Sequence, residues 1–121
     1  MSEEKPDTIW VDLNRANLTL NDYQSFTATT AVYPQKVELE YLSLGLTGEV
    51  GEFTSKLAKW YRKDNEFPTQ ELSDELGDIL WFVARLASHL GRDLSDIAYE
   101  NQEKLTSRKE RGVLKGSGDH R

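Results

Sequence analysis

The sequence predicts an all-α fold, a helical bundle of about four main helices. Apolar residues recur at the 3.6-residue period of a helix through two long segments, and glycine and proline residues mark the segment ends. No segment alternates apolar and polar residues in the way that marks a strand. A chain of 121 residues with 37% hydrophobic residues fits one domain with a modest core, which favours oligomerisation.

The first helix is expected over residues 20–32. Thr19 or Asn21 can cap its N-terminus, and Pro34 lies just beyond its end. Residues 1–18 have no clear period and are interpreted as an N-terminal arm, either docked or only partly ordered.

The second helix is expected over residues 37–62, with one apolar stripe along its length. The stripe consists of Leu39, Leu42, Leu46, Val50, Phe53, Leu57 and Tyr61. Gly45, Gly48 and Gly51 lie inside this helix, although an interior glycine costs about 1 kcal/mol relative to alanine. We therefore expect another backbone to come close at these glycines, and a bend near Gly48 is the alternative.

The third helix is expected over residues 70–90, with Thr69 as its N-cap and Gly91 as its C-terminal stop. Its apolar stripe consists of Leu72, Leu76, Ile79, Val83, Leu86 and Leu90. A fourth helix is expected over residues 94–110, capped by Asp93 or Ser95. Residues 112–121 form a Gly-rich, basic C-terminal tail, which leaves residues 19–111 as the domain.

The composition excludes several classes of protein and site. The net charge of −6 argues against binding to nucleic acid polymers, although bound cations would let an acidic site accept a nucleotide. The chain has no cysteine, which excludes thiolate metal sites, and its two histidines are too few for an imidazole-rich centre. Neither a signal peptide nor a membrane span is expected, so the cytoplasm is the default location.

Four acidic residues form two pairs with the same spacing. Glu49 and Glu52 lie in GEVGE, and Glu75 and Asp78 lie in DELGD. Residues three apart share a helix face, so two packed helices would gather four carboxylates. Such a group repels itself unless a hard divalent cation binds, and oxygen-only ligands favour Mg²⁺, Mn²⁺ or Ca²⁺. The pattern predicts a metal-dependent enzyme that acts on phosphates.

Other metal and nucleotide motifs do not fit. Di-iron bundles use Glu-x-x-His pairs, and no histidine stands at the equivalent spacing in this chain. The sequence also contains no EF-hand loop, no P-loop and no G-x-G-x-x-G.

The sequence resembles the MazG-like family of all-α nucleoside triphosphate pyrophosphohydrolases. That family shows E-x-x-E, a variable spacer and then E-x-x-D, which here span Glu49 to Glu52 and Glu75 to Asp78. The surrounding segments LGLTGEVGEF, ELSDELGDILWFVARLA and NQEKLTSRKERG also look like the helices of the family. Many relatives carry a further acid directly before the first pair. This chain has Gly48 there, which leaves the number of bound cations open.

The resemblance implies hydrolysis between the α- and β-phosphates of an NTP or dNTP, which releases NMP and pyrophosphate. It also implies a requirement for Mg²⁺ (with Mn²⁺ as a substitute), a homodimer or homotetramer, and a house-cleaning role in the nucleotide pool. Glu49, Glu52, Glu75 and Asp78 would hold the cation, and Glu52 is a candidate base toward the attacking water.

Candidate substrate contacts fall into two groups, and for each residue a solvated charge or an ordinary core ring is the alternative. Near the acidic motifs, lysine can pair with phosphate and an aromatic ring can stack on a base. This first group is Lys59, Trp60 and Phe82. The second group, along the fourth helix, is Asn101, Lys104 and Arg108, and the resemblance implies that Asn101 and Lys104 contribute to the nucleotide site.

Two narrower activities and one different class of protein remain as alternatives. The enzyme could resemble phosphoribosyl-ATP pyrophosphohydrolase, or it could be selective for dCTP or dUTP. In the different class, the chain is a non-catalytic helical module whose acids bind a structural cation or stay solvated.

Overall fold

The computed structural model describes residues 15–63 and 66–121 of the chain. This part contains four α-helices, two short 3₁₀ helices and no strand, which confirms the all-α prediction. Most of the predicted N-terminal arm lies outside the described residues. The α-helices are α2 (Leu20–Thr29), α3 (Glu38–Lys63), α4 (Thr69–His89) and α5 (Leu94–Glu110), and the 3₁₀ helices are η1 (Arg15–Asn17) and η2 (Gln35–Val37).

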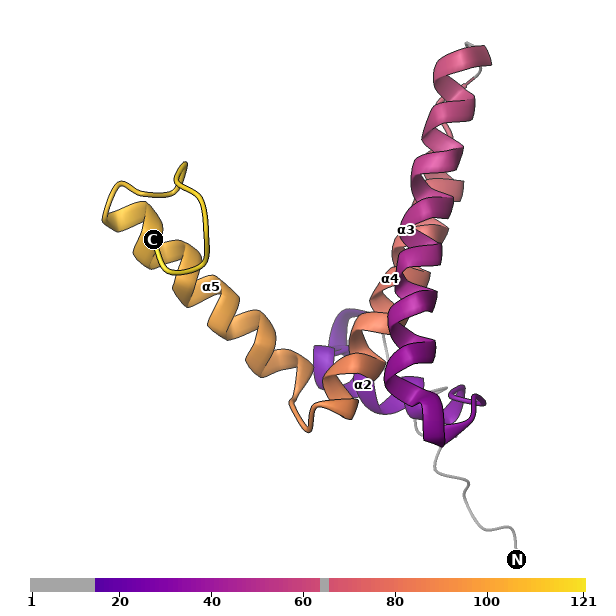
Figure 1. Cartoon of the computed structure of the whole chain (residues 1–121), viewed down its shortest axis with the longest axis horizontal. Coiled ribbons are helices and arrows are strands. Elements are labelled where there is room, and N and C mark those ends of the chain that lie inside the picture. Colours follow the sequence, from indigo (N-terminus) through magenta and orange to yellow (C-terminus); the bar gives the residue numbers. More distant parts are fainter. Residues whose placement is uncertain (1–14, 64–65) are drawn as a thin grey trace, which may run out of the picture.

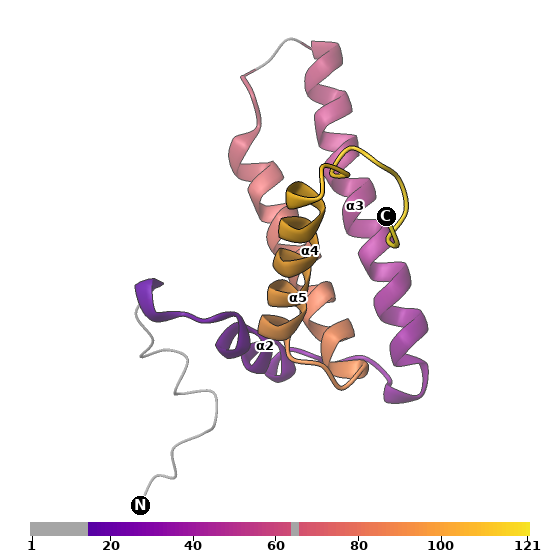
Figure 2. The ribbon, with the colours of Figure 1, turned by 90° about the vertical axis from the view of Figure 1, so that its left-hand side faces the viewer.

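A long antiparallel hairpin of α3 and α4 forms the centre of the molecule. These two helices contact each other more extensively than any other pair. Helix α2 crosses the base of the hairpin, and α5 leaves that base and runs away from α3 (Figure 1). In the perpendicular view, α5 lies in front of α4 as a separate arm (Figure 2). The helices therefore form two arms joined at the base rather than four parallel rods.

The helix ends follow local chemistry, with small differences from the sequence prediction. Thr19 forms the expected capping box with Asp22 at the start of α2. Helix α2 ends at Thr29, three residues early, because the hydroxyls of Thr29 and Thr30 donate to carbonyls of the preceding turn and compete with helical bonds. Helix α4 begins at Thr69 rather than after it, so the prediction of Thr69 as the N-cap was wrong. Gly91, at φ +70, ends α4 as expected.

Helix α5 has the predicted bounds but not the predicted cap. Asp93 stands at the N-cap position and makes no capping hydrogen bond with its side chain. Instead, α2 supplies the acceptors, because Gln24 Oε1 accepts from the Leu94 amide at 2.7 Å and Asn21 Oδ1 accepts from the Ser95 amide at 3.0 Å. These bonds satisfy donors that a helix start leaves free, and they fix α2 to the base of α5.

The buried core is small, and its main cluster lies where α2, α4 and α5 meet. Ala84, Ala87 and Leu94 are buried there, with Tyr23, Val83 and Ile97 packed around them. Several residues of the two predicted apolar stripes are exposed instead, namely Leu39, Val50, Tyr61, Leu76 and Leu90. The periodicity therefore identified apolar faces correctly, but one copy of the chain does not bury all of them.

The glycines of α3 differ from one another in their surroundings. A Cβ at Gly45 would collide with the Phe82 ring, with Cδ1 at 3.1 Å and two ring atoms closer still. At Gly48, Gly51 and Gly77, such a Cβ has no atom of the described chain within 4 Å apart from the adjoining residues and the backbone of its own helix. Helix α3 runs unbroken through all three of its interior glycines. At Gly45, an aromatic side chain makes the close approach that we expected from a backbone.

Candidate functional site

Three of the four predicted acids meet across the α3–α4 hairpin. One carboxylate oxygen each from Glu49, Glu75 and Asp78 lies within 4.8 Å of the others. Glu75 is buried, Glu49 is half-buried and Asp78 is exposed, so the cluster opens from the helix interface toward solvent. We call these three residues the acid cluster. The i, i+3 spacing on α4 places Glu75 and Asp78 on one face, and the antiparallel pairing places Glu49 opposite them.

Electrostatic interactions in the acid cluster shift the pKa values of Glu49 and Glu75 in opposite directions. Hydrogen bonding to Glu75, followed by desolvation and the negative charges of Asp78, Glu75 and Glu52, raises the pKa of Glu49 to about 7. A hydrogen bond from Lys56, at 2.5 Å, is the main reason that the pKa of Glu75 is lowered. Glu49 therefore takes up a proton more readily than an isolated glutamate, whereas Lys56 favours the ionised form of Glu75.

The acid cluster fits a divalent cation. Glu75 Oε2 is buried, and no donor in the described part of the chain reaches it. Oε1 of the same carboxylate is already paired with Lys56. A proton on Glu49 or a cation between the carboxylates would satisfy the second oxygen, and an all-oxygen donor set suits Mg²⁺ or Mn²⁺.

Glu52, the fourth predicted acid, lies outside the three-oxygen cluster. Its side chain is exposed on α3, one turn from Glu49. It still acts on the site, because its negative charge contributes to the raised pKa values of Glu49 and Lys56. Glu52 is therefore a neighbour of the acid cluster with its carboxylate in solvent.

Lys59 and Trp60 line a pocket of about 340 Å³ at the end of α3. Lys56 and Lys63 complete the basic part of its wall, while Glu66 and Glu71 lie on the opposite side. We call Lys56, Lys59 and Lys63 the lysine face. The sequence prediction missed Lys56, although its position one turn after Glu52 and two turns after Glu49 would have placed it on the acidic face.

Phe82 lies against α3 in an aromatic group at the lower part of the hairpin. Its ring fills the space beside Gly45 and lies 5.1 Å from the Trp81 ring and 6.5 Å from the Tyr41 ring, between centroids. Gly45 precedes Glu49 by one turn, and Phe82 follows Asp78 by one turn. The ring thus lies one helical turn along from the acid cluster on both helices, and its role in stacking on a base stays a prediction.

The predicted residues of α5 lie on the other arm of the molecule, which points away from α3 (Figure 1). Asn101 and Lys104 are exposed, and the guanidinium of Arg108 is buried, with the residue only 4% accessible. Arg108 Nη2 donates to Asp119 O at 3.0 Å and to Asp119 Oδ1 at 3.2 Å, so it ties the C-terminal tail back onto α5. A single copy does not bring these residues to the acid cluster.

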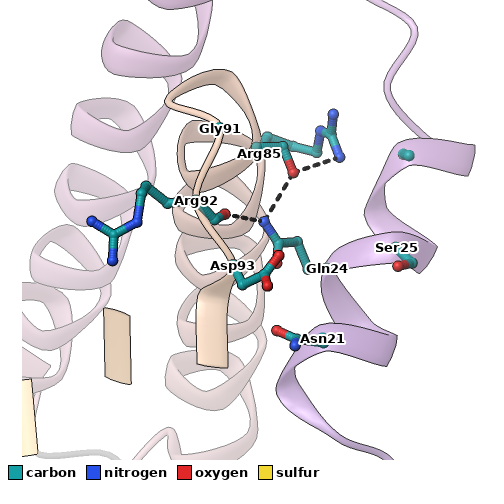
Figure 3. Close-up of a pocket in the computed structure, with 9 residues that line it drawn as sticks. Asn21, Gln24, Ser25, Arg85, Gly91, Arg92 and Asp93 are labelled. Carbon is teal, nitrogen blue, oxygen red and sulfur yellow. Dashed lines mark hydrogen bonds between the residues drawn. The ribbon is translucent and has the colours of Figure 1, made fainter. Parts of the chain in front are cut away.

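A polar pocket of about 480 Å³ lies on the other side of the base, between α2 and the α4–α5 connection. None of the predicted site residues lines it. Gln24 spans it and donates to Ser88 Oγ and Arg92 O, while the Arg92 side chain points away (Figure 3). These bonds serve to join α2 to the end of α4.

Comparison with known proteins identifies the family. The family model for the MazG nucleotide pyrophosphohydrolase domain matches residues 37–113, more than half of the chain. The chain belongs to the MazG family. This confirms the resemblance drawn from the two acidic motifs, and it assigns the chain to a family of nucleotide pyrophosphohydrolase domains.

A relative of this MazG protein is the Gene 37 protein of Mycobacterium phage L5. The two are 44% identical over 109 residues, which cover 82% of this chain and 96% of the phage protein. No solved structure matches the chain significantly. None of the described helices has the length and apolar character needed to cross a membrane.

Proposed function

We propose that this protein hydrolyses nucleoside triphosphates, either NTP or dNTP, to NMP and pyrophosphate with Mg²⁺. The observation that carries the proposal is the convergence of Glu49, Glu75 and Asp78 to within 4.8 Å in a chain of the MazG family. Removal of noncanonical or excess nucleotides from the pool is the corresponding cellular role.

Glu49, Glu75 and Asp78 would hold the cation, with Glu52 able to turn toward it from the next turn of α3. When bound, the cation supplies positive charge that offsets the charge developing on the phosphates. Glu52 has an exposed carboxylate one turn along α3 from Glu49, and we propose that it orients a water toward the α-phosphorus and takes its proton. The negative charges of the neighbouring carboxylates would favour a cation at the acid cluster.

At the end of α3, Lys59 would pair with the phosphates and the Trp60 ring would contact the nucleotide. The Phe82 ring would stack on the base. Asn101, Lys104 and Arg108 would take part only when a second copy brings α5 to the acid cluster. The exposed Leu44, Val50 and Leu76 of the hairpin support a homodimer or homotetramer, because large apolar side chains this exposed favour association.

The test is incubation of the purified protein with a panel of NTPs and dNTPs in Mg²⁺, with identification of the products. NMP and pyrophosphate in equal amounts support the proposal, and the ranking of rates gives the preferred substrate. The matched control is Glu75→Gln, which keeps the size of the buried side chain and removes its charge. Release of orthophosphate, or equal activity in the control, would refute the assignment, and no hydrolysis of any nucleotide would favour the non-catalytic module.

A further inference from the structure

Lys56 is the positive charge that pairs with the most buried carboxylate of the acid cluster, Glu75. Its Nζ lies 2.5 Å from Glu75 Oε1, and the Glu75 side chain is only 10% exposed. The Lys56 side chain is itself 32% exposed, so its ammonium can leave Glu75 without unfolding any helix. No other lysine or arginine in the described part of the chain forms an ion pair with the acid cluster.

Lys56 and a divalent cation would bind the same carboxylate, that of Glu75. Both are positive, and both would be held by carboxylate oxygens that lie within a few ångströms of one another. Like charges at such separation repel strongly in a partly desolvated site. Binding of a dication by the acid cluster therefore favours departure of the Lys56 ammonium from Glu75.

The lysine face provides a destination for the displaced ammonium. Lys56 already lines the pocket of about 340 Å³ that also contains Lys59 and Lys63. These three side chains lie at spacings of three and four on α3, so they share one side of the helix. Glu66 and Glu71 reduce the positive charge of the pocket without cancelling it, since three lysines face two glutamates. Such a pocket next to a cation site suits the terminal diphosphate of a polyphosphate chain.

We propose that Lys56 is an internal counter-ion that a divalent cation displaces from Glu75, and that the displaced ammonium then binds the β- and γ-phosphates together with Lys59 and Lys63. Before the metal binds, Lys56 limits repulsion within the acid cluster. After the metal ion binds, the Lys56 ammonium faces the pyrophosphate group, which is the leaving group of the proposed reaction. The identity of the phosphate ligand rests on the function proposed above, whereas the competition with the metal does not.

The experiment compares Lys56→Met with Lys63→Met, which removes the same charge from the same face without touching a cluster carboxylate. Mn²⁺ binding without nucleotide is measured by electron paramagnetic resonance of the free ion. Lys56→Met should bind Mn²⁺ about tenfold more tightly than wild type, and the affinity of Lys63→Met should stay within about twofold of wild type. Lys56 competes directly with the ion for Glu75, whereas Lys63 only repels it over a longer, screened distance. Pyrophosphate binding in the presence of Mg²⁺ is measured by calorimetry. It should weaken in both variants.

Unchanged or weaker Mn²⁺ binding in Lys56→Met would show that Lys56 only supports the structure, and would overturn the inference. Tighter Mn²⁺ binding with unchanged pyrophosphate binding would overturn the phosphate role. Absence of Mn²⁺ binding in wild type and both variants would overturn both parts. Circular dichroism checks the fold, and Lys56→Gln replaces Lys56→Met if the latter is unfolded. Failure to hydrolyse any nucleotide would refute the proposed function alone, because the Mn²⁺ comparison requires no turnover.

Discussion

Replacement of Gly45 by alanine tests whether the Phe82 ring is held against α3. Two neighbouring glycines of the same helix make a matched pair. A Cβ at Gly45 would meet the Phe82 ring at distances that real structures do not tolerate, whereas a Cβ at Gly48 meets nothing within 4 Å in the described chain. Any general preference of a helix for alanine acts on both positions, so the difference between the two variants isolates the contact with the ring.

The expected magnitudes follow from two opposing effects. Alanine in place of glycine inside a helix contributes about 1 kcal/mol of stability, so Gly48→Ala should raise the free energy of unfolding by about that amount. At Gly45 the same gain is set against an overpacking cost of roughly 1–3 kcal/mol, since Tyr41 and Trp81 limit the movement of the ring. We expect Gly45→Ala to range from neutral to about 2 kcal/mol less stable than wild type.

The assay is thermal unfolding followed by circular dichroism at matched protein concentration. A change of 1 kcal/mol corresponds to roughly 4 °C in Tm for a domain of this size. Introducing Phe82→Leu into the Gly45→Ala background should recover stability, because a smaller side chain leaves room for the new methyl group. Equal stabilisation by Gly45→Ala and Gly48→Ala, with no coupling to Phe82, would refute the reasoning.

Three further outcomes are expected. The pKa of Glu49 is raised from its ordinary value of 4.5 to about 7 in the folded protein. The stability that this group contributes is therefore complete below pH 4.5 and is lost as the pH rises through 7. In metal-free buffer, the Tm of wild type should fall more between pH 5.5 and pH 8 than the Tm of Glu49→Gln. Gln24→Leu leaves the Leu94 amide and the Arg92 carbonyl without their partner and should lower the free energy of unfolding, measured in urea, by about 2–3 kcal/mol. The control Ser25→Ala, on the exposed side of α2, should change that free energy little. Arg108→Met removes the bonds that hold residues 118–119 and should speed amide hydrogen exchange in the C-terminal tail, with protection in α3 unchanged.

The sequence predicted the positions of the helices better than the contacts that cap their ends. The predicted bounds of α5 were correct, and its C-terminal end is a local feature because Gly112, at φ +71, follows the last turn. The end of α2 was placed too late because the apolar pattern continues past Thr29, and a pattern does not show that threonine hydroxyls compete with the helical bonds. The cap of α5 was missed for a different reason, since Gln24 lies 70 residues away in the chain.

In the candidate site, too, relations within one helix were predictable from the sequence, whereas contacts between helices were not. Spacing on one helix predicted correctly that Glu75 and Asp78 share a face, but it could not distinguish Glu49, which reaches them, from Glu52, which stays in solvent. That difference depends on the rotation of α3 against α4. Lys56 was missed because a lysine on a helix resembles a surface charge until its partner across the interface is known. The roles of Glu52 and of the predicted substrate contacts remain predictions.

The acid cluster is costly to the fold, and this cost argues for a ligand. Glu49, Glu75 and Asp78 hold three carboxylates within 4.8 Å in a domain whose buried core is small. The Lys56 ammonium on Glu75 reduces their repulsion, and the raised pKa of Glu49 favours a proton there that would reduce it further. Apolar side chains at the same places would remove the repulsion and add burial, so stability alone does not account for the acids. Both compensations bring positive charge to a carboxylate of the acid cluster, and a divalent cation would take the place of both.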